Sequence, residues 1–331
     1  MMKRTTPRPV ARLAGETGYD PVRSACPTDL KLDGNEGPEP SPDCLARLVA
    51  AGTETLRRYP DSRGLEALLA ARLDVEASRV LVTAGADEAL DRICRAYLDG
   101  SRTLVTAVPT FEMIPRYARL AGAEVLTASW PAGNFPVDEV LGLVDDRTGV
   151  IAVVSPNNPT GAVATVQDLV RLAEAAPGAL LLVDLAYGEF AEEDLMATVL
   201  QLPNALAVRS LSKAWGLAGL RVGYVAGARE LVAPLRAAGG PYAVSGPSLL
   251  AVSAALADEG RVEDFVAVIR SEREILRADL TRLGADPVPS QGNFVYAAFT
   301  DPAWVRDGFC LLYTSPSPRD EQFHLVCRLL L

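Results

Sequence analysis

The stretch "RVLVTAGADEALDRICRAYL" at residues 79–98 decides the class of fold. Its first half is a short apolar run that ends at an Ala-Gly turn, which is typical of a buried strand. Its second half repeats apolar side chains every three or four positions and so predicts a helix with one apolar face, formed by Leu90, Ile93, Cys94 and Tyr97. A buried strand that leads directly into an amphipathic helix is the repeating unit of an α/β sheet.

The same unit recurs downstream. The further apolar runs are "TLVTAV", "EVLTAS", "VIAVVS", "ALLLVD", "NALAVRS" and "RVGYVAG", and helical stretches such as "VQDLVRLAEAA" separate several of them. Continuous apolar strands that alternate with helices predict a mostly parallel sheet with helices on both faces. Ligands of such a sheet bind at the carboxyl ends of its strands, so the residues there are the candidates for function.

The chain divides into an N-terminal arm with part of a small domain (1–45), a large domain (46–245) and a small α/β domain (246–309). Residues 261–283 predict one long amphipathic helix, and "VPSQGNFVYAAF" after it predicts a strand of the small domain.

Composition excludes several classes of function. The net charge of −10 and the absence of a basic stripe argue against nucleic-acid binding. No apolar run approaches the roughly 18 residues of a membrane span, and the N-terminus lacks the apolar core of a secretory signal. We therefore expect a cytoplasmic protein.

The reactive side chains narrow the chemistry. The five cysteines show no metal or redox spacing, which favours reduced thiols and no metal site. The only histidine is His324, so a serine–histidine triad is not expected. Acid–base chemistry then depends on lysine, tyrosine or carboxylates.

Two predicted strand ends carry polar turns. "VTAGADEAL" (82–90) leads through a glycine into a helix, whose free N–H groups form either an anion site or an ordinary junction. The second turn is "VVSPNNPTGAV" (153–163), which has two interpretations. Asn157 is a hydrogen-bond donor to a bound ring, or the stretch is an ordinary Asn-Pro turn capped by Thr160.

Two further strand ends carry charge. Asp184 closes the apolar run of "ALLLVDLAYGEF" (179–190), where a buried carboxylate needs a cation or caps the next helix, and Tyr187 follows it. "RSLSKAWGLAGLRVGY" (209–224) combines a lysine amine suited to a Schiff base with the hydroxyls and arginine that suit a phosphate monoester. The alternative for Lys213 is a solvated lysine at a helix start.

The four strand ends together are more specific than each alone. Asn157, Asp184 and Lys213 are 27 and 29 residues apart, about one strand–helix unit each, so the sheet brings them to one edge. A phosphate site, a carboxylate for a ring nitrogen and a free amine together describe a site for pyridoxal 5′-phosphate.

With these motifs the sequence resembles the fold-type I pyridoxal-phosphate enzymes of the class I/II aminotransferase group, and most of all the histidinol-phosphate aminotransferases. The resemblance runs in order over residues 19–309 and includes "LDGNEGPEPSP", "RRYPDSRGLEALLAARL", "SPNNPTG", "RSLSKAWGLAGLRVGY" and "SQGNFVY". It implies the aspartate aminotransferase-like fold, with residues 46–245 as the cofactor-binding domain.

The resemblance also implies roles for single residues. Lys213 would form the Schiff base and shuttle a proton, Asp184 would hold the proton of the ring nitrogen, and Asn157 and Tyr187 would contact the phenolic oxygen. Phe111 would stack on the ring. The positions expected at the cofactor phosphate are Gly85, Ala86, Asp87, Ser210, Ser212 and Arg221.

Other matching positions concern the partner subunit and the substrate. Tyr59 of the partner subunit would reach the phosphate, which implies a homodimer. Tyr19, Asn35 and Asn293 match positions near the substrate. The sequence departs from the family pattern at Glu39, Leu185 and Ala243, none of which belongs to the core cofactor chemistry.

The implied reaction is ping-pong transamination of L-histidinol phosphate, with a 2-oxo acid such as 2-oxoglutarate as acceptor, in histidine biosynthesis. An aromatic amino acid aminotransferase, a threonine-phosphate decarboxylase-like enzyme and a non-catalytic binding protein are the alternatives.

The last residues depart from the family. "CLLYTSPSPRD" (310–320) resembles one reading frame of a sequencing adapter, and no arginine–strand–helix pattern is evident in 310–331. We expect this segment to be artefactual, with the natural C-terminus and its substrate-binding arginines missing and activity impaired; a divergent natural tail is the alternative.

Overall fold

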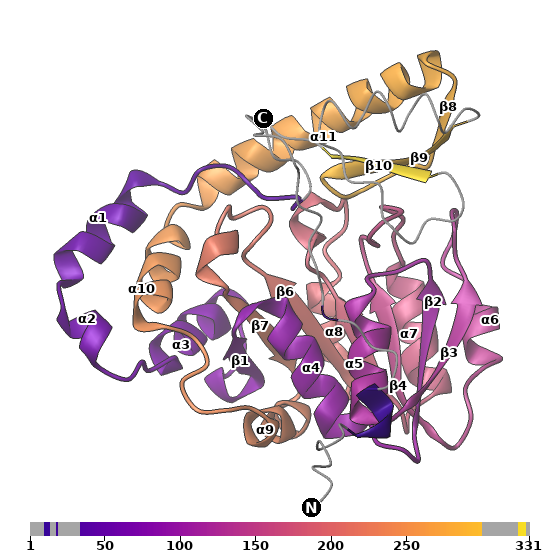
Figure 1. Cartoon of the computed structure of the whole chain (residues 1–331), viewed down its shortest axis with the longest axis horizontal. Helices are drawn as coiled ribbons and strands as arrows, with labels where there is room; N and C mark the ends of the chain where they lie inside the picture. The colour runs from indigo at the N-terminus through magenta and orange to yellow at the C-terminus, as the bar shows by residue number, and fades with distance from the viewer. Residues whose placement is uncertain (1–9, 14–17, 19–33, 300–323, 329–331) are drawn as a thin grey trace, which may run out of the picture.

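The computed structural model describes residues 10–13, 18, 34–299 and 324–328. A seven-stranded sheet forms its centre, in the order β1-β7-β6-β5-β4-β2-β3 (Figure 1). The strands are β1 (Val80–Thr83), β2 (Thr103–Val108), β3 (Glu124–Ser129), β4 (Thr148–Val154), β5 (Leu180–Asp184), β6 (Ala205–Ser210) and β7 (Gly223–Gly227).

Six of these strands run in one direction, and β7 runs against its neighbours β1 and β6. The expected mostly parallel sheet is confirmed. The connection from β6 to β7 contains only the short helix η4 (Ala218–Leu220), and so short a return is compatible with an antiparallel pair but not with a parallel crossover.

Helices cover both faces of the sheet, as expected. The apolar side chains of α4, α5 and α9 pack on one face, and those of α3, α6, α7, α8 and α10 pack on the other. The helices are α1 (Pro42–Ala51), α2 (Glu54–Arg57), α3 (Arg63–Arg72), α4 (Gly85–Tyr97), α5 (Met113–Ala121), α6 (Val137–Leu141), α7 (Val166–Ala175), α8 (Met196–Gln201), α9 (Arg229–Ala238), α10 (Gly246–Ala255) and α11 (Glu259–Arg282). Among the described residues, no helix is both long and apolar enough to cross a membrane.

Side chains alternate between the two faces of the sheet along β6, and this alternation decides to which face Arg209 and Ser210 point. Leu206 and Val208 belong to the core on the α4 face, whereas Ala205 and Ala207 belong to the core on the opposite face. Since successive strand residues point to opposite faces, Ser210 continues the α4 face and Arg209 the other.

A small three-stranded antiparallel sheet lies beside α11 (Figure 1). It consists of β8 (Ala285–Pro287), β9 (Phe294–Phe299) and β10 (His324–Arg328). The helix expected at 261–283 is confirmed by α11. In 310–331, where the sequence shows no arginine–strand–helix pattern, residues 324–328 form β10 and pair with β9 over five residues at the edge of this sheet. The remainder of 310–331 lies outside the described residues.

Candidate active site

Asp184 is the last residue of β5, at the carboxyl edge of the sheet. Its side chain is on the same face as Leu182 and is buried. Its Oδ1 accepts a hydrogen bond from the N–H of Ala186 at 3.0 Å. Burial raises the pKa of Asp184 to about 7, and the nearby Asp87 also raises it, whereas the Ala186 N–H and Lys213 act in the opposite direction. A cation placed beside this carboxylate would stabilise its charged form.

Lys213 lies in the loop that follows β6. Its Nζ donates to the carbonyl oxygen of Gly34 at 2.7 Å and lies 5.6 Å from the centre of the Tyr187 ring. The Tyr187 hydroxyl accepts from Asn35 Nδ2 at 2.9 Å. The amine and the phenol that the sequence pointed to are therefore neighbours, and the segment around residue 35 lies over both.

That segment passes directly over the lysine turn. A Cβ at Gly37 would overlap the carbonyl oxygen of Lys213, and a Cβ at Gly216 would overlap the carbonyl oxygen of Pro38. Gly216 also has φ of +67°, a conformation that side chains rarely adopt. Glycine at these two positions permits the close approach of the two backbones.

The first turn of α4 and the β6–β7 connection form the expected phosphate end. Arg221 pairs with Asp87 at 3.0 Å, and its guanidinium packs so closely on Gly85 that a Cβ there would lie 2.7 Å from Nη2. Ser210 and Ser212 are buried beside this turn. N–H groups at a helix start, an arginine and two hydroxyls are together suited to a phosphate.

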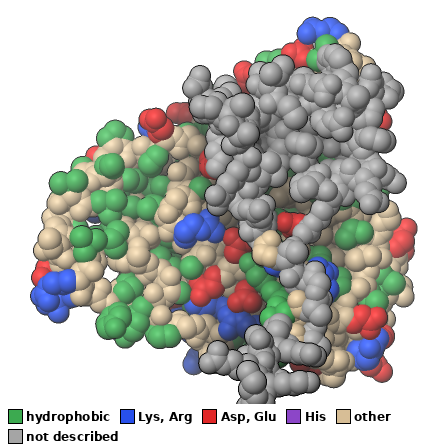
Figure 2. Space-filling model, viewed as in Figure 1, with side chains coloured by type: hydrophobic (Ala, Val, Ile, Leu, Met, Phe, Trp, Pro, Cys, Tyr) green, Lys and Arg blue, Asp and Glu red, His purple; other side chains and the backbone are tan. Residues whose placement is uncertain are grey.

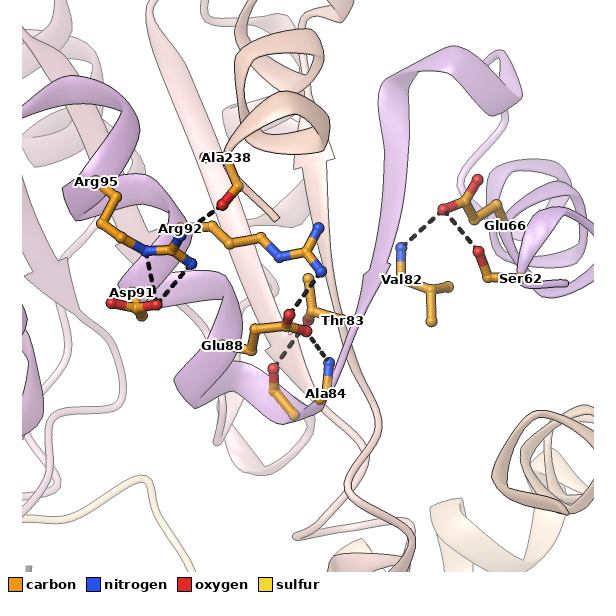
Figure 3. Close-up of polar contacts among 11 residues, drawn as sticks. Ser62, Glu66, Val82, Thr83, Ala84, Glu88, Asp91, Arg92, Arg95 and Ala238 are labelled. Atoms are coloured by element: carbon orange, nitrogen blue, oxygen red, sulfur yellow. Dashed lines mark hydrogen bonds and ion pairs between the residues drawn. The ribbon is translucent and has the colours of Figure 1, made fainter. Parts of the chain in front are cut away.

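A second set of contacts holds the start of α4 in place (Figure 3). Glu88 accepts from the N–H of Ala84 at 2.5 Å and pairs with Arg92 at 2.6 Å. Thr83 Oγ1 donates to the carbonyl oxygen of Gly85 at 2.9 Å. These bonds orient the turn without using the N–H groups of the residues expected at the phosphate, 85–87.

The side chain of Asn157 is fully engaged within the protein. Its Nδ2 donates to the carbonyl oxygen of Pro109 and to Thr160 Oγ1, both at 2.9 Å, and its Oδ1 accepts from Thr110 Oγ1 at 3.1 Å. The expected contact with a phenolic oxygen would require one of these donors to be shared or exchanged.

Two buried amide oxygens in the same region have no donor among the described residues. They are Asn35 Oδ1 and Asn293 Oδ1. The two residues are linked, since Asn293 Nδ2 donates to the backbone oxygen of Asn35 at 3.2 Å. Unpaired buried acceptors are costly, which favours a ligand that donates to them.

Tyr59 and Phe111 have different surroundings from each other. Tyr59 is 82% exposed and stacks on Tyr242, with ring centres 4.5 Å apart. Phe111 follows β2 and packs against the α4-face core. Tyr19 lies outside the described residues.

Sequence reasoning missed a charged cluster behind the lysine turn. Arg209 is buried and pairs with Glu189 and Asp194 on the face of β6 opposite to Ser210. The signal was an arginine that directly follows the apolar run of "NALAVRS", where a buried guanidinium needs a carboxylate.

The comparison with protein families identifies the chain. The model of the family "Aminotransferase class I and II" matches residues 28–327. The chain belongs to this family. The family assignment agrees with the resemblance, and the aspartate aminotransferase-like fold expected from it is confirmed by the seven-stranded sheet and by solved structures of the family.

Two curated relatives of this class I and II aminotransferase are named histidinol-phosphate aminotransferases. Histidinol-phosphate aminotransferase 1 of Thiobacillus denitrificans is 34% identical over 307 residues, which cover 90% of this chain and 78% of the relative. Histidinol-phosphate aminotransferase of Bacillus subtilis is 33% identical over 304 residues, which cover 89% of this chain and 82% of the relative.

Solved structures share the fold at low sequence identity. A histidinol-phosphate aminotransferase from Sinorhizobium meliloti in complex with pyridoxal-5′-phosphate superposes with a TM-score of 0.85 at 22% identity, covering 99% of this chain and 93% of that one. An L-threonine-O-3-phosphate decarboxylase from Porphyromonas gingivalis has a TM-score of 0.78 at 22% identity, covering 91% and 94%. Two activities on one fold mean that the fold alone does not select the substrate.

Proposed function

We propose that this chain is a pyridoxal-phosphate-dependent aminotransferase that moves the amino group of L-histidinol phosphate to a 2-oxo acid such as 2-oxoglutarate, in histidine biosynthesis in the cytoplasm. The observation that carries the proposal is the meeting of Asp184, Lys213 and the Arg221 turn at one edge of the sheet. The identity of about a third to histidinol-phosphate aminotransferases over most of the chain supports the substrate.

The residues fit the cofactor. Asp184 is a buried carboxylate whose pKa is raised to about 7. A protonated ring nitrogen beside it would supply the positive charge that stabilises its charged form. The Arg221 guanidinium, the two buried serines and the α4 start suit its phosphate. Lys213 has a primary amine 5.6 Å from the Tyr187 ring, in the connection between β6 and the Arg221 turn.

When bound, pyridoxal 5′-phosphate supplies an electron sink for the electron pair that remains when a proton leaves the substrate carbon. The protein's part is to place and move protons. Asp184 would hold a proton on the ring nitrogen. Lys213 Nζ would take the proton from the substrate carbon as a general base and would then donate it as a general acid.

The direct test uses the purified full chain with pyridoxal 5′-phosphate. We expect a visible absorbance band from the Schiff base with Lys213, and bleaching of the band by L-histidinol phosphate. The Lys213→Ala variant should not form this band. The matched control is Arg236→Lys, far from the lysine turn, which should form it normally.

Other outcomes of this test select other functions. Bleaching by an aromatic amino acid but not by L-histidinol phosphate would assign the chain to aromatic substrates. Release of CO₂ from a phosphorylated amino acid, without amino transfer to 2-oxoglutarate, would assign it to a decarboxylase. If no band forms at all with the wild-type chain, the proposed function is wrong.

We also propose that the chain acts as a homodimer. Large hydrophobic side chains are exposed over α1, α2 and the segment before α10, on the side of the molecule that Figure 2 shows at the left, and they include Leu45, Val49, Leu56, Tyr59 and Tyr242. An apolar surface of this kind favours association. The dimer would bring Tyr59 of the partner subunit to the phosphate end.

Light scattering with a charge substitution tests the dimer. Leu56→Arg should convert the dimer to a monomer, because the arginine would have to be desolvated in the interface. Tyr59→Phe should leave the dimer intact and weaken cofactor binding by about tenfold, the loss expected for one hydrogen bond. A wild-type chain that is monomeric at high concentration would contradict this proposal.

A further inference from the structure

A buried ionic cluster lies behind the lysine turn, on the face of β6 away from the candidate site. The Arg209 side chain is only 6% exposed and pairs with Glu189 at 3.3 Å and also with Asp194. Glu189 in turn accepts from Trp215 Nε1 at 3.3 Å. The Glu189 carboxylate therefore joins three parts of the chain, which are the turn that contains it, the end of β6 through Arg209 and the loop after β6 through Trp215.

Two of these parts carry the candidate catalytic groups. Glu189 is in the short helix η3 (Gly188–Phe190), whose N-cap is Tyr187. Trp215 is two residues beyond Lys213. The hydrogen bond between Trp215 and Glu189 thus connects the turn of the phenol to the turn of the amine from behind.

The fit of the cluster to η3 is tight. A Cβ at Gly188 would overlap Nη1 of Arg209, so the guanidinium packs directly on the backbone beside Tyr187. From the other side, Arg270 of α11 donates to the carbonyl oxygens of Glu189, Phe190 and Ala191. Two arginines therefore hold η3 between the sheet and α11.

A cavity of about 570 Å³ lies beside the cluster, and Arg209, Glu189, Trp215 and Arg270 are among its lining residues. Because this space is not filled by side chains, η3 and the loop after β6 have room to shift if the ionic contacts are lost. Phe190, Ala214 and Leu211 are buried in apolar cores, so packing fixes the inner side of both segments, and the ionic contacts fix the side that faces the cavity.

We propose that Arg209, Glu189 and Trp215 form a positioning clamp, which holds Tyr187 and Lys213 in their mutual geometry from the face of β6 opposite the cofactor site. The side-chain contacts of the clamp described above join Arg209, Glu189, Asp194 and Trp215 and include no side chain expected at the phosphate. The clamp therefore acts on the formation of the Schiff base and on proton transfer, and leaves phosphate recognition unchanged. This inference rests on the proposed function.

The test measures the two properties separately in the full chain freed of cofactor. The rate of Schiff-base formation is followed by visible absorbance after mixing with pyridoxal 5′-phosphate, and the affinity of the phosphate end is measured by competition with inorganic phosphate. We expect Arg209→Lys and Glu189→Gln to slow Schiff-base formation by about 10- to 100-fold, the range that a misplacement of about 1 Å can produce. The inhibition constant for inorganic phosphate should stay within about twofold of wild type, and kcat should fall with little change in KM.

The control is Arg236→Lys. Arg236 is 40% exposed and pairs with the buried Glu66 at 3.1 Å, so this variant disturbs a more exposed ion pair between α9 and α3. It should keep the wild-type rate of Schiff-base formation. The double variant Arg209→Lys/Glu189→Gln should be no slower than the slower single variant, because the two side chains act as one unit.

A measurement on the cofactor-free chain distinguishes a local loss of positioning from a general loss of stability. Amide hydrogen exchange in the cofactor-free chain should accelerate in residues 185–191 and 211–217 of the Arg209→Lys variant and stay unchanged in the core of β4 and β5. If Arg209→Lys fails to fold, Glu189→Gln, which preserves the shape of the side chain, serves alone.

Three outcomes would overturn the clamp. They are an unchanged rate of Schiff-base formation in both variants, a parallel loss of phosphate affinity, and uniformly faster exchange throughout the sheet. A wild-type chain that forms no Schiff base would instead reject the proposed function, so the two failures are distinguishable.

Discussion

Asp184 and Glu189 are carboxylates five residues apart, and they lie on opposite sides of the same sheet edge with different surroundings. Burial is the largest influence on both and raises the pKa of each. Glu189 has a guanidinium beside it, in Arg209. Asp184 has the backbone N–H of Ala186 and only a minor contribution from Lys213.

The difference separates a structural carboxylate from one suited to a ligand. A buried ion pair holds backbone segments in place, and removal of one partner leaves an uncompensated charge. A buried carboxylate without a full partner is costly in the free protein and becomes favourable when a cation binds. Substitution at Asp184 should therefore lower activity without loss of stability, whereas loss of the ion pair at Glu189 should also lower stability.

The largest expected effect is on activity at Asp184. Asp184→Asn removes the charge that would hold a proton on the cofactor ring, so kcat should fall by about 10²–10³-fold, as when one preorganised electrostatic contact is lost. The cofactor-free variant should be at least as stable as wild type. Steady-state kinetics and urea unfolding measure the two quantities. If Asp184→Asn is fully active and less stable than wild type, Asp184 is a structural carboxylate like Glu189 and the prediction is wrong.

The next effect is on stability at the cluster. Arg209→Met should lower the free energy of unfolding by about 3 kcal/mol, the lower end for breaking a buried pair, because Asp194 is more than half exposed. Urea unfolding of the cofactor-free chain measures it, with Arg236→Met as control. A change below about 0.5 kcal/mol, as for an ordinary surface substitution, would show that the cluster contributes nothing to the fold.

A pH series sharpens the comparison. The pKa of Asp184 is raised from 3.8 to about 7 in the folded chain, so between these values the folded chain retains a proton that the unfolded chain has lost. Its contribution to stability is therefore present at low pH and is lost as pH rises through about 7, with a slope of about 1.4 kcal/mol per pH unit.

The difference in unfolding free energy between wild type and Asp184→Asn isolates this slope from other titrating groups. In the cofactor-free chain this difference should change with pH between about 4 and 7. With saturating cofactor its dependence on pH should be much weaker. A flat difference without cofactor would mean that Asp184 already has a full partner.

The smallest effect is expected at the exposed pair beside the candidate site. Arg221 and Asp87 are each about half exposed, at 51% and 43% of their side chains. Asp87→Asn should therefore change the unfolding free energy by less than about 1 kcal/mol. Thermal unfolding measures this change. A loss as large as that of Arg209→Met would place this pair with the structural cluster.

Much of the fold could be predicted because its signal is local. The apolar runs of β1 to β6 and the spacing of apolar residues in α4 and α11 appear directly in the sequence. Because the strand runs are apolar throughout, they indicated a sheet with helices on both faces. The direction of β7 and the pairing of β10 could not be predicted, since each depends on which strand edge is free once the others have assembled.

The candidate site was predictable to a similar degree. The strand ends identified Asp184, Lys213 and Arg221, because the carboxyl ends of parallel strands meet at one edge. Sequence spacing contained no information on the partners of Asn157, which are Thr110, Pro109 and Thr160, because hydrogen bonds between distant segments depend on their final approach.

The sequence by itself determined which chemical groups meet at the sheet edge, since strand alternation and the strand–helix repeat are local properties of the chain. Only the tertiary structure decided which of those groups already have partners. Lys213 faces the carbonyl of Gly34, 179 positions away, and Glu189 faces Arg209 across the sheet edge. The physical reason is that burial and pairing depend on distance in space, and this distance exists only after the segments have packed.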